Sequence, residues 1–104
     1  MIQELNNSNW KVIKEAGKIK VIDFYASWCG PCKTLGPILE DLEKEYSNSV
    51  EFFKADVEEC YDASDEFRVM SVPTVFILKD GEVVDKIVGL GSKDKIKSTI
   101  DGAI

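Results

Sequence analysis

A run of apolar residues leads into two closely spaced cysteines in the stretch Val21-Ile22-Asp23-Phe24-Tyr25-Ala26-Ser27-Trp28-Cys29-Gly30-Pro31-Cys32-Lys33. A Cys-x-x-Cys pair between a predicted strand and a predicted helix is typical of a dithiol redox site. Pro31 suits the first turn of the helix, where a missing N–H breaks no hydrogen bond. Cys29 would then lie at the helix N-terminus, where unpaired N–H groups and the helix dipole lower the pKa of a thiol. We therefore expect Cys29 to be the thiolate that attacks a disulfide.

The second cysteine, Cys32, lies one helical step further on and should be more buried than Cys29, which we expect to be exposed. Burial raises the pKa of a thiol, which suits a group that later resolves the mixed disulfide on Cys29. The other interpretation of the pair is half of a zinc site. Zinc needs about four nitrogen or sulfur ligands, and the chain has three cysteines and no histidine, so the sequence favours the redox interpretation.

The length of 104 residues predicts a single domain over residues 1–104. The formal net charge of −6 argues against nucleic acid or an anionic membrane as a partner, because both attract basic surfaces. No segment approaches the ~18 apolar residues of a membrane span. No signal peptide is visible, so we expect a cytoplasmic protein unless an import segment has been removed. Without histidine, proton transfer must use a carboxylate, a lysine, a tyrosine or water.

Strand and helix signals alternate along the chain. Apolar and β-branched runs predict strands at residues 2–5, 19–26, 50–57, 74–78 and 83–88. Helical spacing of apolar residues predicts helices at residues 10–16, 30–46, 58–67 and 92–100. Asp80-Gly81 predicts a hairpin turn, and strands joined through helices should run parallel. The order therefore predicts an α/β fold in which four helices flank a mixed sheet of parallel strands plus an antiparallel C-terminal hairpin.

Two charged residues interrupt the predicted strands. Asp23 lies in an apolar strand expected to be covered on both faces, and desolvation there should raise its pKa. Such a carboxyl group could accept the proton of Cys32, through a water molecule. The other interpretation is a structural aspartate paired with Lys54 in the next predicted strand, and the two are compatible. Lys54 would then temper the pKa of Asp23, unless it is simply a solvated strand lysine.

These residues together resemble the thioredoxin family. The motif Trp28-Cys29-Gly30-Pro31-Cys32-Lys33 is similar to the active-site signature of that family as it stands. The resemblance covers nearly the whole chain and includes Asp23, Pro37, Lys54, Val72-Pro73-Thr74, Lys79-Asp80-Gly81 and Gly89. It departs from the common pattern at Ser71, where many members have glycine, and in the additional thiol of Cys60. The resemblance implies a thioredoxin fold.

The resemblance also implies a function. It implies a general protein-disulfide reductase that cycles Cys29 and Cys32 between dithiol and disulfide, maintains cell redox homeostasis, donates electrons to target proteins and needs no bound cofactor. A thioredoxin reductase, either a flavoprotein or a ferredoxin-linked enzyme, would recycle it. The targets expected from the family are peroxiredoxins, ribonucleotide reductase and methionine sulfoxide reductases, and the expected state is a monomer.

Further residue roles follow from the resemblance and, for an apolar patch, from the residues themselves. Gly30 and Pro31 would set the redox balance of the dithiol. A cis peptide bond would precede Pro73 and present the Val72 backbone to an extended partner chain; the other interpretation is a trans proline that opens an edge strand. An apolar patch around Cys29 would bind partners, since exposed apolar patches mark interaction sites. Its members would be Trp28, Pro31, Val72, Pro73 and Gly89.

Several alternatives remain open in the sequence. Trp28 could be a core residue rather than a rim residue, whereas Trp10 is expected to pack in the core. Cys60 is expected to be a small buried hydrophobe, and the alternative is a regulatory thiol open to oxidation or to dimer formation. The fold could also serve as a binding module with incidental redox chemistry, or two copies could hold a metal cluster between their dithiols.

Overall fold

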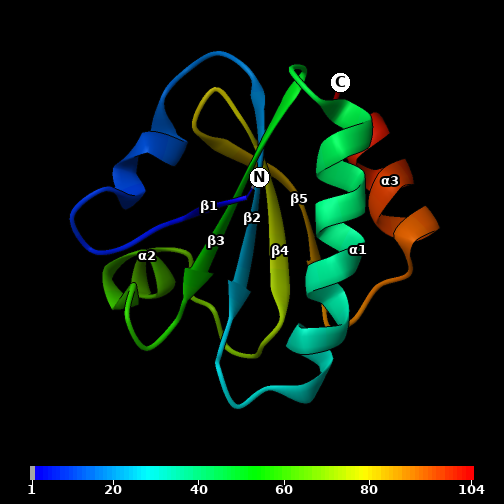
Figure 1. The fold of residues 1–104 in the computed structure, drawn as a ribbon. Helices are drawn as coiled ribbons and strands as arrows, with labels where there is room; N and C mark the ends of the chain where they lie inside the picture. The colour runs from blue at the N-terminus through cyan, green and yellow to red at the C-terminus, as the bar shows by residue number, and fades with distance from the viewer. Residues whose placement is uncertain (1) are drawn as a thin grey trace.

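The computed structural model describes residues 2–104 and contains a five-stranded sheet in the order β1-β3-β2-β4-β5 (Figure 1). The strands are β1 (Gln3–Glu4), β2 (Ile19–Tyr25), β3 (Val50–Asp56), β4 (Thr74–Lys79) and β5 (Glu82–Val88). The helices are α1 (Gly30–Tyr46), α2 (Tyr61–Glu66), α3 (Lys93–Asp101) and a short 3₁₀ helix, η1 (Trp10–Lys14). The predicted mixed sheet between helices is confirmed, with three α-helices in the described residues instead of four.

The two faces of the sheet carry separate cores. Val21 and Leu39 belong to the core beneath α1 and α3, whereas Ile22 and Ile13 belong to the core beneath η1 and α2. Figure 1 shows α1 and α3 on one side of the sheet and α2 on the other. Because side chains alternate along a strand, a central strand covered on both faces must be apolar throughout. Six of the seven residues of β2 are buried, which confirms the predicted central strand.

The direction of β4 differs from the prediction. Strands β1, β2 and β3 are mutually parallel, but β4 runs antiparallel to β2 although a helix joins it to β3. The connection through residues 57–73 does not cross back over the sheet. Strand β3 ends at Asp56, level with Tyr25, and β4 begins at Thr74, level with Phe24, so both lie at the same end of the sheet. The short helix α2 lies in this connection.

The first predicted helix is a 3₁₀ turn. Trp10 is buried as expected and Ile13 is buried as well, but Ala16, inside the predicted helix at residues 10–16, is exposed and lies beyond the end of η1. A 3₁₀ helix has three residues per turn, so positions 10 and 13 share a face and position 16 has no need to be helical. Asn9 precedes η1 without a side-chain cap, and Asn6 Oδ1 accepts from the Ser8 and Asn9 backbone N–H groups instead.

Helix α2 begins later than predicted. Glu58 precedes the helix, in a turn where its N–H donates to Asp56 Oδ1 at 2.9 Å. An aspartate side chain that binds the backbone two residues on competes with helix formation. Cys60 is therefore the N-cap residue, without a side-chain hydrogen bond to the helix, and Ala63 and Phe67 pack with it in the core beneath α2.

The long helix and the C-terminal hairpin follow the sequence closely. Helix α1 has the predicted bounds of residues 30–46, contains Pro37 and buries Leu35, Leu39, Leu42 and Tyr46. The hairpin turn places Asp80 at φ 51° and Gly81 at φ 83°, which is the pattern of a type I′ turn. A Cβ atom at Gly81 would lie 2.5 Å from the Lys14 carbonyl oxygen, so the turn also needs glycine for its contact with η1.

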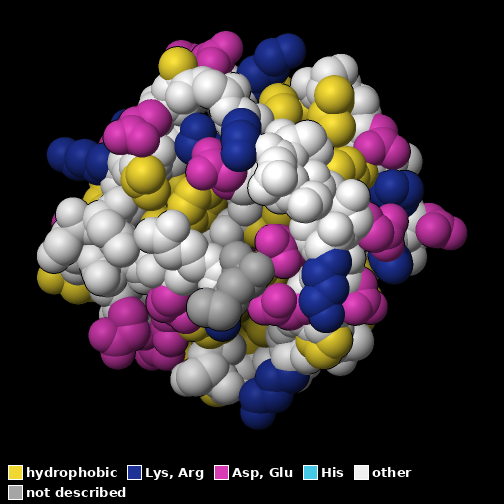
Figure 2. All heavy atoms as spheres, turned by 45° about the horizontal axis from the view of Figure 1, so that its top comes forward, with side chains coloured by type: hydrophobic (Ala, Val, Ile, Leu, Met, Phe, Trp, Pro, Cys, Tyr) yellow, Lys and Arg dark blue, Asp and Glu magenta, His cyan; other side chains and the backbone are white. Residues whose placement is uncertain are grey.

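The surface is mixed in charge. On the face that Figure 2 shows, lysine and arginine side chains are interspersed with aspartate and glutamate and form no continuous basic area. Within residues 2–104, no helix has both the length and the apolar character needed to cross a membrane.

Candidate functional site

The two cysteines of the motif lie at the N-terminus of α1 and form a disulfide with a Cα–Cα distance of 5.3 Å. Cys29 is the N-cap residue, with extended backbone angles, and its Sγ accepts a hydrogen bond from the Cys32 N–H at 3.2 Å. Gly30 and Pro31 are the first two residues of the helix. The predicted position of Cys29 among the free N–H groups of a helix start is confirmed.

The predicted difference in exposure between the cysteines is wrong for the disulfide form. Cys29 is 4% exposed and Cys32 is 6% exposed. The sulfurs of both cysteines lie at the start of α1, and neighbouring side chains cover the pair. These are Tyr25, Ala26, Val57 and Val72. A target can therefore reach Cys29 only through the narrow part of its surface that remains open.

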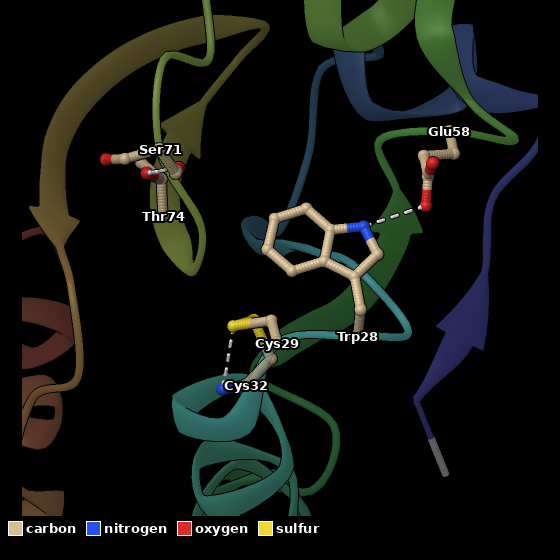
Figure 3. Close-up of a disulfide and its surroundings, with 6 residues drawn as sticks. All are labelled: Trp28, Cys29, Cys32, Glu58, Ser71 and Thr74. Carbon is tan, nitrogen blue, oxygen red and sulfur yellow. Dashed lines mark hydrogen bonds between the residues drawn. A yellow bond between two sulfur atoms is a disulfide. The ribbon is translucent and has the colours of Figure 1, made fainter.

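The two tryptophans differ as expected. Trp28 is 69% exposed, whereas Trp10 is 4% exposed and packs in the core. Figure 3 shows the Trp28 indole beside the disulfide, with Nε1 turned away from the sulfurs toward Glu58. The Trp28 Nε1–H donates to Glu58 Oε1 at 3.1 Å. A large apolar side chain beside the cysteines is thus held outward by one hydrogen bond.

A second segment reaches the disulfide from the start of β4. The Val72–Pro73 peptide bond is cis, as the resemblance implied. Val72 packs against the cysteine pair, and the Pro73 carbonyl accepts from the Gly89 N–H at 2.8 Å. Gly89 has φ +87°, a conformation that strains other residues. Pro73 itself is buried, so it supports the expected patch from below instead of forming its surface.

Ser71 is placed beside this segment. Its carbonyl accepts a hydrogen bond from Thr74 Oγ1 at 2.7 Å, and its side chain is exposed (Figure 3). Because the Ser71 contact uses the backbone, the departure from glycine leaves this hydrogen bond unaffected.

Asp23 and Cys32 line the same cavity of about 270 Å³, together with Lys33 and Lys54. Asp23 is 5% exposed, and within residues 2–104 its buried Oδ1 has no hydrogen-bond partner. Burial raises the pKa of Asp23 to about 7, although the positive charge of Lys54 opposes the rise. The expectation of a desolvated carboxyl group near the dithiol is confirmed.

The expected ion pair between Asp23 and Lys54 is not the contact that Lys54 makes. The two residues are register partners on β2 and β3. However, Lys54 Nζ lies 3.8 Å from Glu4 Oε1, and in the described part of the chain it makes no ion pair with Asp23. The Lys54 side chain is 41% exposed. Lys54 therefore acts on Asp23 through its charge, from the rim of the cavity.

The comparisons with known proteins agree with this geometry. The family model for thioredoxin matches residues 1–102. The chain belongs to the thioredoxin family. Thioredoxin of Staphylococcus haemolyticus is 40% identical over 100 residues, which is 96% of this chain and 95% of the relative. Thioredoxin of Staphylococcus aureus is 40% identical over 83 residues, 80% of either chain.

Solved thioredoxin structures have the same fold. The thioredoxin of Malassezia sympodialis superposes with a TM-score of 0.89 at 32% identity, covering 98% of this chain and 90% of that one. Oxidised mitochondrial thioredoxin 3 of Saccharomyces cerevisiae gives a TM-score of 0.86 at 36% identity, covering 97% and 94%. As a thioredoxin-family member, the chain is a thiol–disulfide oxidoreductase, and its cysteine pair fits dithiol–disulfide exchange.

The third cysteine of this thioredoxin-family protein stands apart from the site. Cys60 is fully buried and unpaired in the core beneath α2, and burial raises the pKa of its thiol. These facts confirm the interpretation of Cys60 as a small buried hydrophobe. Across residues 2–104, no three His, Cys, Asp or Glu side chains are grouped so that they could hold a metal ion.

Sequence reasoning missed two acidic residues beside the site. Glu58 was expected in a helix, but it accepts the Trp28 hydrogen bond. Glu4 lies on the weakest strand, yet it contacts both Tyr25 and Lys54. The pairing of β1 with β3 brings Glu4 there, and no local sequence signal encodes that pairing.

Proposed function

We propose that this thioredoxin-family protein reduces disulfides in other proteins, with Cys29 as the attacking group and Cys32 as the resolving group. The observation that carries the proposal is the position of Cys29 Sγ at the start of α1, where it accepts the Cys32 N–H. In the reduced protein the same N–H and the helix dipole favour a thiolate over a thiol. Gly30 and Pro31 form the helix start that fixes this geometry, so we assign them the tuning of the dithiol.

The exchange proceeds in two displacements. The Cys29 thiolate attacks one sulfur of a target disulfide, whose S–S bond breaks, and the other target sulfur leaves as a thiolate and takes up a proton. The Cys32 thiol then loses its proton and attacks Cys29 Sγ. The mixed disulfide breaks, the second target thiolate leaves and is protonated, and the Cys29–Cys32 disulfide forms. The target gains two electrons, both from this protein, and two protons: Cys32 gives up one, and water supplies the other because Cys29 reacts already as a thiolate.

Asp23 is proposed to accept the Cys32 proton. A general base works best when its pKa lies near the operating pH, and the pKa of Asp23 is raised to about 7. The shared cavity of about 270 Å³ has room for a water molecule between the Asp23 carboxyl and Cys32. Lys54, at the rim of that cavity, would limit how far the pKa rises.

The direction of transfer is proposed from the family. Thioredoxins lie at the reducing end of the scale of dithiol proteins, and Gly30-Pro31 between the cysteines is the family pattern. We therefore propose that a thioredoxin reductase supplies the electrons. We propose peroxiredoxins, ribonucleotide reductase and methionine sulfoxide reductases as target classes, and action as a monomer in the cytoplasm, where thiols are kept reduced.

Targets are proposed to bind across the exposed surface beside Cys29. Trp28 offers an exposed apolar face on one side, and the segment through Val72 offers a backbone edge on the other. Pro73 and Gly89 hold this edge through their hydrogen bond. An extended target chain could pair with the Val72 backbone as an added strand, which would bring a target disulfide next to Cys29.

Insulin reduction by dithiothreitol tests the proposal. Catalytic amounts of this protein should accelerate the precipitation of the insulin B chain, whereas the Cys29→Ser variant should give the uncatalysed rate. The Cys60→Ala variant, which keeps the dithiol, is the matched control and should remain active. No acceleration by the wild-type protein would contradict a protein-disulfide reductase, and wild-type rates with Cys29→Ser would contradict the role of Cys29.

A further inference from the structure

A row of residues crosses the sheet beneath α1 at the level of Asp23. Glu4 on β1 pairs in register with Lys54 on β3, and Lys54 pairs in register with Asp23 on β2. The next position in the row is Val75 on β4. Residues in register on neighbouring strands point to the same face of the sheet. The side chains of Glu4, Lys54 and Asp23 thus lie side by side on one face of the sheet. Asp23 is the buried member of these three.

The outer end of the row is fixed by two contacts. The Tyr25 hydroxyl lies 2.8 Å from Glu4 Oε1 and 2.9 Å from Oε2, so it donates to the carboxylate. Glu4 Oε1 lies 3.8 Å from Lys54 Nζ. Tyr25 and Lys54 line the cavity that holds Asp23, whereas Glu4 lines a neighbouring hollow with Glu40. The lysine ammonium is therefore drawn toward the outer side of the cavity rim.

The inner end of the row is left without a partner. Asp23 Oδ1 accepts no hydrogen bond from the described residues, although its register neighbour is a lysine. A lysine side chain is long, flexible and attracted to a carboxylate more strongly in a poorly solvated cavity than in water. Something must therefore compete for Lys54, and Glu4 is the group that contacts it.

We propose that Glu4 is a positioning residue for the transfer of the Cys32 proton to Asp23, because it holds the Lys54 ammonium at the cavity rim and away from the Asp23 carboxyl. The proposal rests on the proposed role of Asp23 as the proton acceptor. An Asp23 carboxylate paired with Lys54 would be a weaker base, and a weaker base accepts the Cys32 proton more slowly.

The charges around Asp23 are consistent with this role. Lys54 lowers the pKa of Asp23 and Glu4 raises it, in addition to the larger rise from burial. The other titratable groups that line these two hollows are Cys32, Lys33 and Glu40 from α1 and Tyr25 from β2, and Asp56 at the end of β3 lies close enough to act on Tyr25. Removing Glu4 would remove a negative charge and release a positive one, and both changes lower the pKa of Asp23.

Titration of the Asp23 side chain by carboxyl-carbon NMR in the oxidised full chain tests the proposal. In Glu4→Gln, which keeps an oxygen acceptor for Tyr25, the pKa of Asp23 should fall by about one, the effect of a nearby opposite charge. In Lys54→Met the pKa of Asp23 should rise. In the double variant, adding Glu4→Gln to Lys54→Met should lower the pKa of Asp23 by less than half of the fall seen in Glu4→Gln alone. The reason is that the lysine which Glu4 held at the rim is no longer present.

The control is Glu40→Gln, which removes a carboxylate from the neighbouring hollow and should leave the Asp23 titration unchanged. An Asp23 pKa that does not move in Glu4→Gln would overturn the proposal, as would an equal fall in Glu40→Gln or a full-sized fall in the Lys54→Met background. The proposed function fails separately: resolution of a mixed disulfide at an unchanged rate in Asp23→Asn would remove Asp23 as the base. That result says nothing about the Asp23 titration in Glu4→Gln.

Discussion

Replacing Asp23 with asparagine should stabilise the protein at alkaline pH. The carboxyl group is 5% exposed, and its pKa is about 7 in the folded protein against an ordinary value of 3.8. That difference corresponds to about 4 kcal/mol at 1.36 kcal/mol per pKa unit. It is the free energy by which burial of the charged form weakens the fold, and Asp23→Asn removes the charge with little change in shape.

The sign of the pH dependence follows from proton binding. Below pH 3.8 the Asp23 carboxyl is neutral in both the folded and the unfolded state, so its charge costs nothing. As the pH rises from 3.8 to about 7, the unfolded state releases the proton first, and the wild-type protein loses stability. Above about pH 7 the full penalty is present. The advantage of Asp23→Asn should therefore grow from near zero at pH 4 toward about 4 kcal/mol at pH 8.5.

Guanidinium denaturation of the oxidised proteins at pH 4, 5.5 and 8.5 measures this difference in the free energy of unfolding. Asp65→Asn is the matched control, because Asp65 is exposed on α2; its effect should stay within about 0.5 kcal/mol at each pH. The reasoning is refuted if the stability difference between Asp23→Asn and the wild type is the same at pH 4 and pH 8.5.

Three further results are expected. Cys32→Ser should trap targets from a cell extract as mixed disulfides on Cys29, which gel mobility under non-reducing conditions would reveal; an absence of adducts would contradict Cys32 as the resolving group. In the folded oxidised protein Cys60 should resist Ellman's reagent until denaturant is added, and rapid labelling would contradict its full burial. Gly89→Ala should lower the free energy of unfolding by about 1–2 kcal/mol, because Gly89 has a positive φ. Gly36→Ala, where a Cβ would enter open space on α1, should raise the free energy of unfolding by about 0.5–1 kcal/mol. Denaturation curves that show equal effects for the two variants would contradict the argument.

The parts of the fold that local chemistry controls could be predicted from the sequence. Apolar periodicity located β2 and the buried stripe of α1, and Asp80-Gly81 located the hairpin. The dithiol could be predicted equally well, because two cysteines around Gly30-Pro31 at a strand-to-helix junction determine which sulfur caps the helix. The raised pKa of Asp23 could also be predicted, because a carboxyl group in a strand that is covered on both faces must lose its contact with water.

The parts that depend on distant contacts could not be predicted. The direction of β4 depends on whether its connection spans the sheet, which a short helix does not reveal by itself. The partner of Lys54 depends on the pairing of the two-residue strand β1, so the sequence suggested Asp23 and the structure has Glu4. The similar burial of Cys29 and Cys32 depends on side chains packed around them from residues 25–26, 57 and 72.

The pH dependence of Cys29 alkylation in the reduced protein tests the central claim most directly. Iodoacetamide reacts with thiolates, and mass spectrometry identifies which cysteine is modified at each pH. If the start of α1 stabilises the thiolate, Cys29 should be modified first, with a midpoint well below the pKa of about 8.5 of a free cysteine. A midpoint at or above that value, or equal modification of Cys29 and Cys32 at every pH, would contradict the account.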